Sequence, residues 1–198
     1  MYADDIILLS ISVTDLQLMF NLCSEVFTDL DLPINVSKCH CICIGPRCNT
    51  MCSTLNIQGA AVHWAESTKY LGITICQAKS FKCLWDESKS KFYCNCNVIL
   101  GRLGTTAPAN VVLKLISTQS VQNLLYGIAS TSLNNSELKS FSHAYNSMFS
   151  KVFNSFDSHV ISYCQFYSGH LCFNMLYDLQ RYVFLSKLLA NECINNNL

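Results

Sequence analysis

Residues 2–10 read Tyr2-Ala3-Asp4-Asp5-Ile6-Ile7-Leu8-Leu9-Ser10, an acidic pair followed at once by a short apolar run. The apolar run, residues 6–9, has the length and composition of a β-strand. Next, Ser12-Val13-Thr14-Asp15 is typical of a capping box that opens a helix. Apolar residues then follow at helical spacing: Leu16, Met19, Phe20, Cys23, Val26, Phe27 and Leu30. Because Pro33 disfavours helix before it, we expect the helix to cover residues 13–31.

The remainder of the chain changes from strand-like to helical patterns. Residues 34–44 alternate like a strand, residues 48–60 show no regular pattern, and residues 61–64 and 70–76 predict two strands joined at residues 66–68. Helical spacing then predicts helices over residues 84–103, from an N1 proline at Pro108, from the caps Asn134 and Asn135, and over residues 173–190. The sequence therefore predicts an α+β fold, with mixed structure in residues 1–76 and a helical bundle in residues 77–198.

Composition restricts the class of protein. Hydrophobic residues make up 51% and charged residues 13% of the 198 residues, which indicates a globular chain and not a disordered one. No uncharged run has the roughly 20 mainly apolar residues of a spanning helix, and no basic segment of a signal peptide precedes Tyr2. The 13 cysteines are an odd number, which favours reduced thiols. We therefore expect an intracellular protein, in the cytoplasm or nucleus, without a membrane partner.

Charge is unevenly distributed, although the net charge is zero. Residues 1–37 contain six acidic residues and no lysine or arginine, whereas residues 38–114 contain nine basic residues against three acidic ones. An acidic head before a basic middle suits a metal site beside a surface that contacts phosphates. Chance clustering of few charges is the alternative explanation.

The acidic pair has two interpretations. Adjacent carboxylates can bind Mg²⁺ together with substrate phosphates, as two-metal nucleotidyl transfer requires. Alternatively, Asp4 and Asp5 form an ordinary solvated turn. Zinc is not expected, because Cys39, Cys41 and Cys43 alternate along a predicted strand and no Cys-x-x-Cys pair is present.

Several blocks in one order resemble a known family. The Tyr2-Ala3-Asp4-Asp5 segment resembles the palm turn of reverse transcriptases, and residues 32–38 resemble the Leu-x-x-Asn-x-x-Lys segment after the palm helix of non-LTR (LINE-type) elements. Trp64 followed by residues 69–73 is similar to their primer-grip hairpin. Residues 91–93, 97–100, 125–127 and 151–153 resemble their thumb and the segment beyond it. Cys39 and Ala129 depart from the family pattern.

The resemblance implies a role for each matched residue. Asp4 and Asp5 would be catalytic carboxylates that bind Mg²⁺, and Lys38 would act near the triphosphate. The nucleotide and primer would contact Tyr2, Ala3, Trp64, Tyr70, Leu71 and Gly72. A thumb helix would present Lys82, Lys89, Lys91 and Arg102 to the nucleic-acid backbone. The partners would be an RNA template and a DNA primer, with no obligate protein partner.

The same resemblance implies an incomplete enzyme. The family's fingers and front palm, with a further metal-binding aspartate, precede the acidic turn, and here only Met1 precedes Tyr2. We therefore expect a palm and thumb fragment that is inactive alone but still binds nucleic acid weakly. Two alternatives remain: a non-catalytic remnant that binds nucleic acid, and a helical module for protein interaction.

Overall fold

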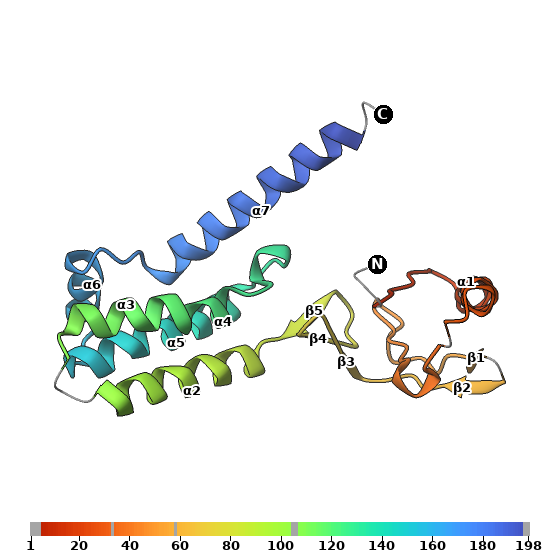
Figure 1. Cartoon of the computed structure of the whole chain (residues 1–198), viewed down its shortest axis with the longest axis horizontal. Coiled ribbons are helices and arrows are strands. Elements are labelled where there is room, and N and C mark those ends of the chain that lie inside the picture. Colours follow the sequence, from red (N-terminus) through yellow and green to blue (C-terminus); the bar gives the residue numbers. More distant parts are fainter. Residues whose placement is uncertain (1–4, 33, 58, 104–106, 196–198) are drawn as a thin grey trace. The chain divides into compact units, whose positions relative to one another are not determined.

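The computed structural model describes residues 5–32, 34–57, 59–103 and 107–195. The fold is α+β, with helices and two small antiparallel sheets (Figure 1). The chain divides into two compact units, Met1–Leu84 and Trp85–Leu198, which are described separately below.

Unit 1 begins with the predicted helix. Helix α1 spans Val13–Asp29, and the Ser12 side chain accepts a hydrogen bond from the Asp15 amide, as an N-cap does. The second half of the predicted capping box is not formed, because the Ser12 amide donates to Ser10 Oγ (3.1 Å) instead. The buried side of α1 differs in part from the prediction: Leu16 and Phe20 pack on the small core, whereas Met19, Val26 and Leu30 are exposed. These three residues lie on the outer side of a helix that packs against the sheet on one side only.

The small core of unit 1 lies between α1 and a hairpin. Strands β1 (Leu55–Ile57) and β2 (Ala60–Val62) pair in antiparallel register, and Leu55, Ile57 and Val62 are buried with Cys41. The side-chain amide of Gln17 donates to the Asn56 carbonyl (2.7 Å) and accepts from the Asn56 amide (2.8 Å). Gln17 thus hydrogen-bonds to the backbone amide and carbonyl at the edge of β1, as a neighbouring strand would. The sequence pattern had predicted no regular structure for β1, whereas β2 contains the first two residues of the strand predicted at residues 61–64.

Two predicted strands are absent. Residues 6–9 form no ladder, and Leu9 is 80% exposed, because within the described residues no strand pairs with them. Residues 34–44 form the 3₁₀ turn η1 (Val36–Lys38) and two isolated bridges, at Cys41 and Ile44. Local hydrogen bonds explain this second error: Ser37 donates to the Asn35 side chain, and the Lys38 amide donates to the Asn35 carbonyl.

The second sheet of unit 1 has the order β3-β4-β5, with β3 at Ser67–Tyr70, β4 at Ile73–Cys76 and β5 at Lys82–Leu84. The hairpin turns at Leu71 and Gly72, because Tyr70 pairs with Ile73. The predicted turn at residues 66–68 is therefore wrong, and Ser67 and Thr68 belong to β3. The polar character of this stretch reflects an exposed strand and not a turn.

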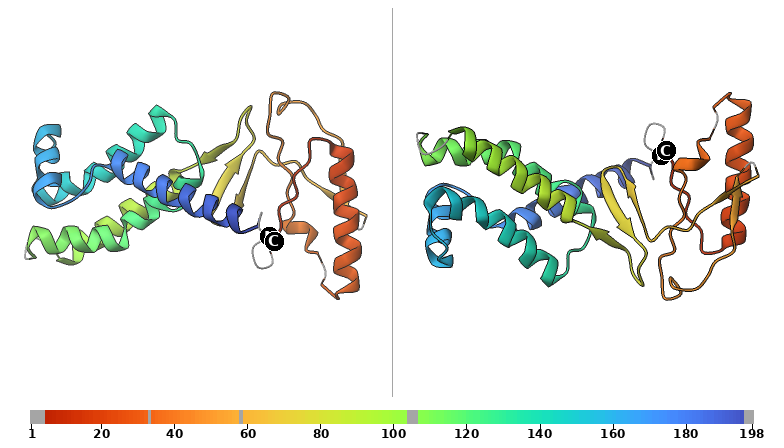
Figure 2. Two further views of the ribbon diagram at one scale, coloured as in Figure 1. Left: turned by 90° about the horizontal axis from the view of Figure 1, so that it is seen from above. Right: turned by 90° about the horizontal axis from the view of Figure 1, so that it is seen from below.

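Unit 2 is a bundle built around one helix. Its elements are α2 (Asp86–Leu103), α3 (Ala109–Gln119), α4 (Val121–Leu125), η2 (Ile128–Ser130), α5 (Asn135–Phe153), α6 (Ser158–Tyr167) and α7 (Phe173–Asn195). Helices α2 and α3 run along α5 (Figures 1 and 2), which also contacts α4, α6 and α7. The predicted helices over 84–103 and 173–190 are confirmed except at their ends: Leu84 belongs to β5, and α7 continues to Asn195. Helix α6 was not predicted.

Aromatic residues fill the bundle core. Phe141 on α5 stacks on Phe173 with ring centroids 5.4 Å apart, and Trp85 meets the Phe141 ring edge-on at 5.8 Å. Tyr145 and Phe149 continue this row along α5 and are almost fully buried. The start of α5 is fixed by a capping box, in which Asn134 and Glu137 each accept a hydrogen bond from the other's amide at 2.9 Å. Pro108 is the N-cap of α3 and not its first helical residue.

Candidate nucleic-acid interface

The acidic turn is only partly described. Tyr2, Ala3 and Asp4 lie outside the described residues, while Asp5 is exposed. Lys38 is also exposed, at the end of η1, and within the described part of the chain no ion pair joins it to Asp5. The same part contains no group of three or more side chains able to hold a metal ion.

Trp64 belongs to the core of unit 1. Its indole Nε1 donates to the Ser53 carbonyl (3.0 Å), and its backbone forms a parallel bridge with Cys41. The ring packs, half-buried, against the cluster of Leu55, Ile57 and Val62. Trp64 therefore stabilises the small core of unit 1.

The β3–β4 hairpin has a tight two-residue tip. Leu71 has φ 47° and Gly72 has φ 80°, so both positions are left-handed, as in type I′ turns. Glycine adopts this conformation readily, but for leucine it costs roughly 1–2 kcal/mol. Strained positions of this kind persist where the surroundings hold them and often occur at functional sites. Tyr70 and Leu71 are half-buried at this tip, whereas Gly72 is exposed.

The register of the second sheet places two lysines on one face. Lys69 pairs with Thr74, Thr74 with Leu84, and Cys76 with both Ser67 and Lys82. Side chains alternate between the faces of a sheet, so these residues share a side, which we call the lysine face. Its members are Ser67, Lys69, Thr74, Cys76, Lys82 and Leu84. Lys69 and Lys82 are exposed, and the three strands contain no acidic residue.

The opposite face of this sheet is apolar. It carries Tyr70, Ile73, Ile75 and Cys83, with Thr68 as its one polar member, and Cys83 is only 6% exposed. The sheet therefore has one half-buried apolar face and one solvated basic face. Lys82 was predicted on a thumb helix, but the structure places it at the start of β5. Lys69 was not predicted as a site residue, because the hairpin turn was predicted in the wrong place. With the turn at Leu71 and Gly72, the alternation of residues 67–76 would have put Lys69 on the solvated face of the sheet.

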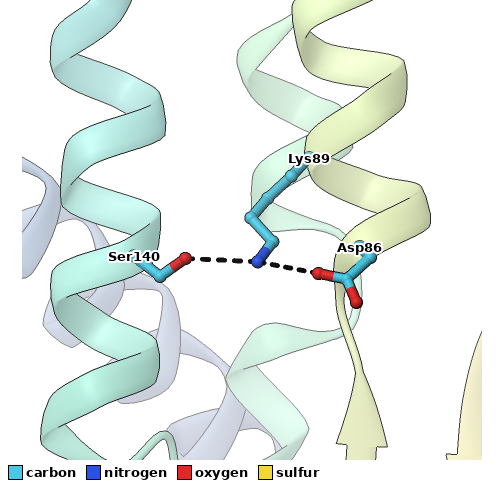
Figure 3. A network of polar contacts seen from close by, with 3 residues as sticks. All are labelled: Asp86, Lys89 and Ser140. Carbon is cyan, nitrogen blue, oxygen red and sulfur yellow. Dashed lines mark hydrogen bonds and ion pairs between the residues drawn. The ribbon is translucent and has the colours of Figure 1, made fainter.

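The three remaining predicted basic residues lie on α2 in different environments. Lys89 donates to Ser140 Oγ on α5 (3.2 Å) and pairs with Asp86 (3.0 Å), so it links α2 to α5 through two exposed partners (Figure 3). Lys91 pairs with Glu87 one turn away at 2.8 Å, and Arg102 is exposed in the last turn. Of the three, Lys91 and Arg102 remain at the surface of unit 2.

A groove of about 390 Å³ lies elsewhere in unit 1, along α1. It is lined by Phe20, Asn21, Ser24, Glu25, Thr28, Asp29 and Ile57. None of the predicted site residues lines it, and its two carboxylates disfavour a phosphate ligand.

Comparisons with protein-family models, curated proteins and solved structures find no match. Among the described residues, no helix combines the length and apolar character needed to cross a bilayer. Any functional conclusion thus depends on the residues and geometry of this chain.

One histidine site in unit 2 was not predicted. Ser168 Oγ donates to the Cys164 carbonyl (2.5 Å), so it accepts from His170 Nδ1 (3.0 Å). The other ring nitrogen, Nε2, then accepts from Ser117 Oγ at 2.9 Å. Burial lowers the pKa of His170, and nearby Lys114 lowers it further, against a backbone hydrogen bond at Ser168. The neutral imidazole thus joins α3 to the loop that follows α6, and spacing in the sequence gave no signal of it.

Proposed function

We propose that this chain is a palm and thumb portion of an RNA-directed DNA polymerase of the non-LTR retrotransposon type, and that its lysine face contacts the backbone of the primer–template duplex. The observation that carries the proposal is the second sheet, in which the register places Lys69 and Lys82 on one solvated face. The ordered blocks from the acidic turn to residues 151–153 support the family.

The spacing of the two lysines suits two phosphates of one nucleic-acid backbone. They stand on strands separated by β4, at positions offset by two residues in register. Strand spacing of about 4.8 Å and a rise of about 3.3 Å per residue then give a separation of roughly 12 Å between their Cα atoms. Each lysine has a long flexible stem, so the two ammonium groups can reach separate phosphates of one backbone. Neutralising phosphates releases counterions, which drives binding without sequence specificity.

The hairpin tip supports contact with a primer end. Gly72 has no side chain and is exposed, so a ligand backbone can approach the turn closely. Tyr70 and Leu71 stand next to it as the apolar and aromatic elements on which a base or sugar can pack. This is the role that the family resemblance assigns to the same residues.

The acidic pair would supply the carboxylates of the chemical step. Asp4 and Asp5 would hold Mg²⁺, since carboxylate oxygens are the protein ligands that this ion prefers. The exposed position of Asp5 agrees with a ligand that faces a water-coordinated ion. When bound, the ion would stabilise charge on the transferring phosphoryl group. Lys38 would add a positive charge near the same phosphates.

A binding titration tests the proposal. Fluorescence anisotropy of a labelled RNA–DNA hybrid gives the affinity at several salt concentrations, and the salt slope falls by about 0.9 for each phosphate that the protein no longer neutralises. We expect Lys69→Ala with Lys82→Ala to reduce the slope by about 1.8. The matched control is Lys139→Ala with Lys187→Ala, which removes two exposed lysines of unit 2. Equal slopes for both double variants would refute a role of the lysine face.

Primer extension separates the enzyme from the alternatives. Extension by the chain that disappears in Asp4→Ala would make it a working polymerase, whereas binding without extension favours the non-catalytic remnant. Absence of binding would favour the interaction module. One observation supports that module: the second half of α7 is apolar and exposed, with Tyr182 at 71% and Leu189 at 60%.

A further inference from the structure

The apolar side chains of α7 differ in exposure according to the side of the helix on which they lie. Phe173 is buried against Phe141 of α5, and Tyr177 is buried beside Thr131. Among the side chains of α7 that the structure describes, the four most exposed large apolar ones are Met175 (58%), Leu179 (48%), Tyr182 (71%) and Leu189 (60%). The helix therefore has a second apolar stripe besides the one that it buries in the bundle.

The spacing of this second stripe is that of a coiled-coil seam. Together with the exposed Ser186, the four residues follow one another at steps of four, three, four and three, which are alternating a and d positions of a heptad. At 3.6 residues per turn the five positions lie within about 80° of one another, on the side of α7 away from Phe173 and Tyr177. We call them the outer seam. So narrow a stripe is the pattern that one helix packed alongside would cover.

Charge does not oppose the meeting of two identical seams. The outer seam contains no charged residue. The e and g positions beside it, between residues 175 and 190, are occupied by Leu176, Asp178, Val183, Leu185 and Ala190. Asp178 is the one charge among them. In a pair related by a twofold axis the same surface serves both chains, so a self-complementary apolar stripe suffices.

The area of the outer seam suits a weak dimer. A large apolar residue presents roughly 150–200 Å² when fully exposed, so the measured fractions leave about 400 Å² on the seam of each chain. Val183 and Leu185, beside the seam, add roughly 150 Å². Two chains would then remove about 1,100 Å² from water, which is at the low end for specific interfaces and typical of weak complexes.

We propose that the outer seam is a self-association site, through which two copies of this chain pair along α7 as a symmetric dimer. Heptad spacing selects a helix as the occupant, and the uncharged stripe of sufficient area makes a second copy of α7 a suitable one. The dissociation constant falls in the micromolar range, so dilute chains are monomers with an open seam. The site is separate from the proposed nucleic-acid contact, because the outer seam and the lysine face share no residue.

Sedimentation of the whole chain over a range of concentrations tests the proposal. The mean mass should rise from that of one chain toward that of two as the concentration increases through the micromolar range. The curve gives the dissociation constant against which variants are compared. High salt should leave this constant nearly unchanged, because no ion pair contributes to the seam.

Two adjacent leucines provide a matched pair of variants. Leu189→Lys places a charge in the outer seam, twice in each dimer, and should raise the dissociation constant at least tenfold. Leu188→Lys makes the same change one residue away, at a side chain that is 45% exposed and lies outside the seam. It should leave the constant unchanged within a factor of about 2. Tyr182→Lys, a second seam variant, should behave like Leu189→Lys, and circular dichroism checks that all three remain folded.

Amide hydrogen exchange locates the contact. Exchange in residues 182–190 should slow as the wild-type concentration rises, because dimerisation stabilises these turns of α7. In Leu189→Lys the exchange should stay fast over the same range of concentrations.

Three results would overturn the proposal. One is a chain that stays monomeric up to about 1 mM. Another is a dimer that Leu188→Lys weakens as much as Leu189→Lys, which would place the contact on a different surface. The third is slow exchange of residues 182–190 in a monomer at every dilution, since the seam would then be covered within one chain. None of these outcomes bears on the salt dependence of nucleic-acid binding by the lysine face.

Discussion

Two glycines of unit 2 provide a direct test of the backbone conformation. Gly169 has φ 71° and follows α6, whereas Gly101 lies inside α2. A Cβ atom added at either position meets no other atom within 4 Å. The same substitution, glycine to alanine, therefore changes only the backbone preference at each site.

Gly169 closes α6 with a Schellman motif. Its amide donates to the Phe166 carbonyl (3.1 Å), and the His170 amide donates to the Gln165 carbonyl (2.9 Å). Alanine in this left-handed conformation costs roughly 1–2 kcal/mol. Part of that cost is offset by about 0.5 kcal/mol, because alanine also restricts the unfolded chain. We expect Gly169→Ala to lower the free energy of unfolding by about 1 kcal/mol.

Gly101→Ala should have the opposite sign. Alanine in a helix is favoured over glycine by about 0.5–1 kcal/mol, and the position near the end of α2 favours the lower value. The two variants should thus differ by about 1.5 kcal/mol. With a urea slope of about 1–3 kcal/mol per molar, their unfolding midpoints should differ by about 1 M.

Urea unfolding followed by far-ultraviolet circular dichroism measures both midpoints, since the helices of unit 2 dominate the signal. The reasoning is refuted if both variants shift the midpoint in the same direction. A Gly169→Asn variant provides a further check, because asparagine tolerates the left-handed region better than alanine. It should lie between the wild-type protein and Gly169→Ala.

Two other predictions concern unit 2. The folded-state pKa of His170 is lowered by burial, so the unfolded chain binds its proton first as the pH falls. The stability that this site contributes is complete above an ordinary histidine pKa of about 6.5 and declines below it. His170→Ala should therefore flatten the pH dependence of the urea midpoint between about pH 7.5 and 5. Replacement of the exposed His143 by Ala serves as the control and should leave that dependence unchanged. Asn134→Ala removes the side-chain half of the capping box on α5 and should cost about 1 kcal/mol by urea unfolding, whereas Asn135→Ala, one residue into the helix, should cost far less; equal effects would contradict the cap.

Local signals predicted the helices well. Ser12 and Asn134 were identified from sequence as caps, and both accept the hydrogen bonds that define a helix start. Capping and helical spacing act within a few residues, so a single sequence contains them. Helix α6 was missed although Asp157 caps it, because its apolar residues follow no clear stripe and many are exposed.

Strands were predicted less well, since a strand depends on a partner elsewhere in the chain. Residues 6–9 have the composition of a strand but form no ladder. The β3–β4 turn was misplaced because Leu71, a residue disfavoured in left-handed turns, occupies its first position. The error had a functional consequence: with the correct register, Lys69 joins Lys82 on the lysine face, whereas residue type alone had assigned Lys82 to a helix.

The candidate site was predicted to different degrees for similar reasons. Residue type identified the basic side chains, but only tertiary contacts distinguish Lys89, held between Asp86 and Ser140, from Arg102 at the surface.

The two halves of helix α7 differ in how they are attached to the bundle. Its first half is anchored: Tyr177 donates to the Thr131 carbonyl, and Arg181 donates to Tyr177 and to Ser132, each at 2.9–3.0 Å. Beyond Arg181, residues 182–190 are all exposed, so among the described side chains none of that part is buried in the core. Opening of those last turns therefore need not disturb the core. In amide hydrogen exchange the bundle should behave as one cooperative unit that ends at Arg181, followed by a segment that opens and closes independently.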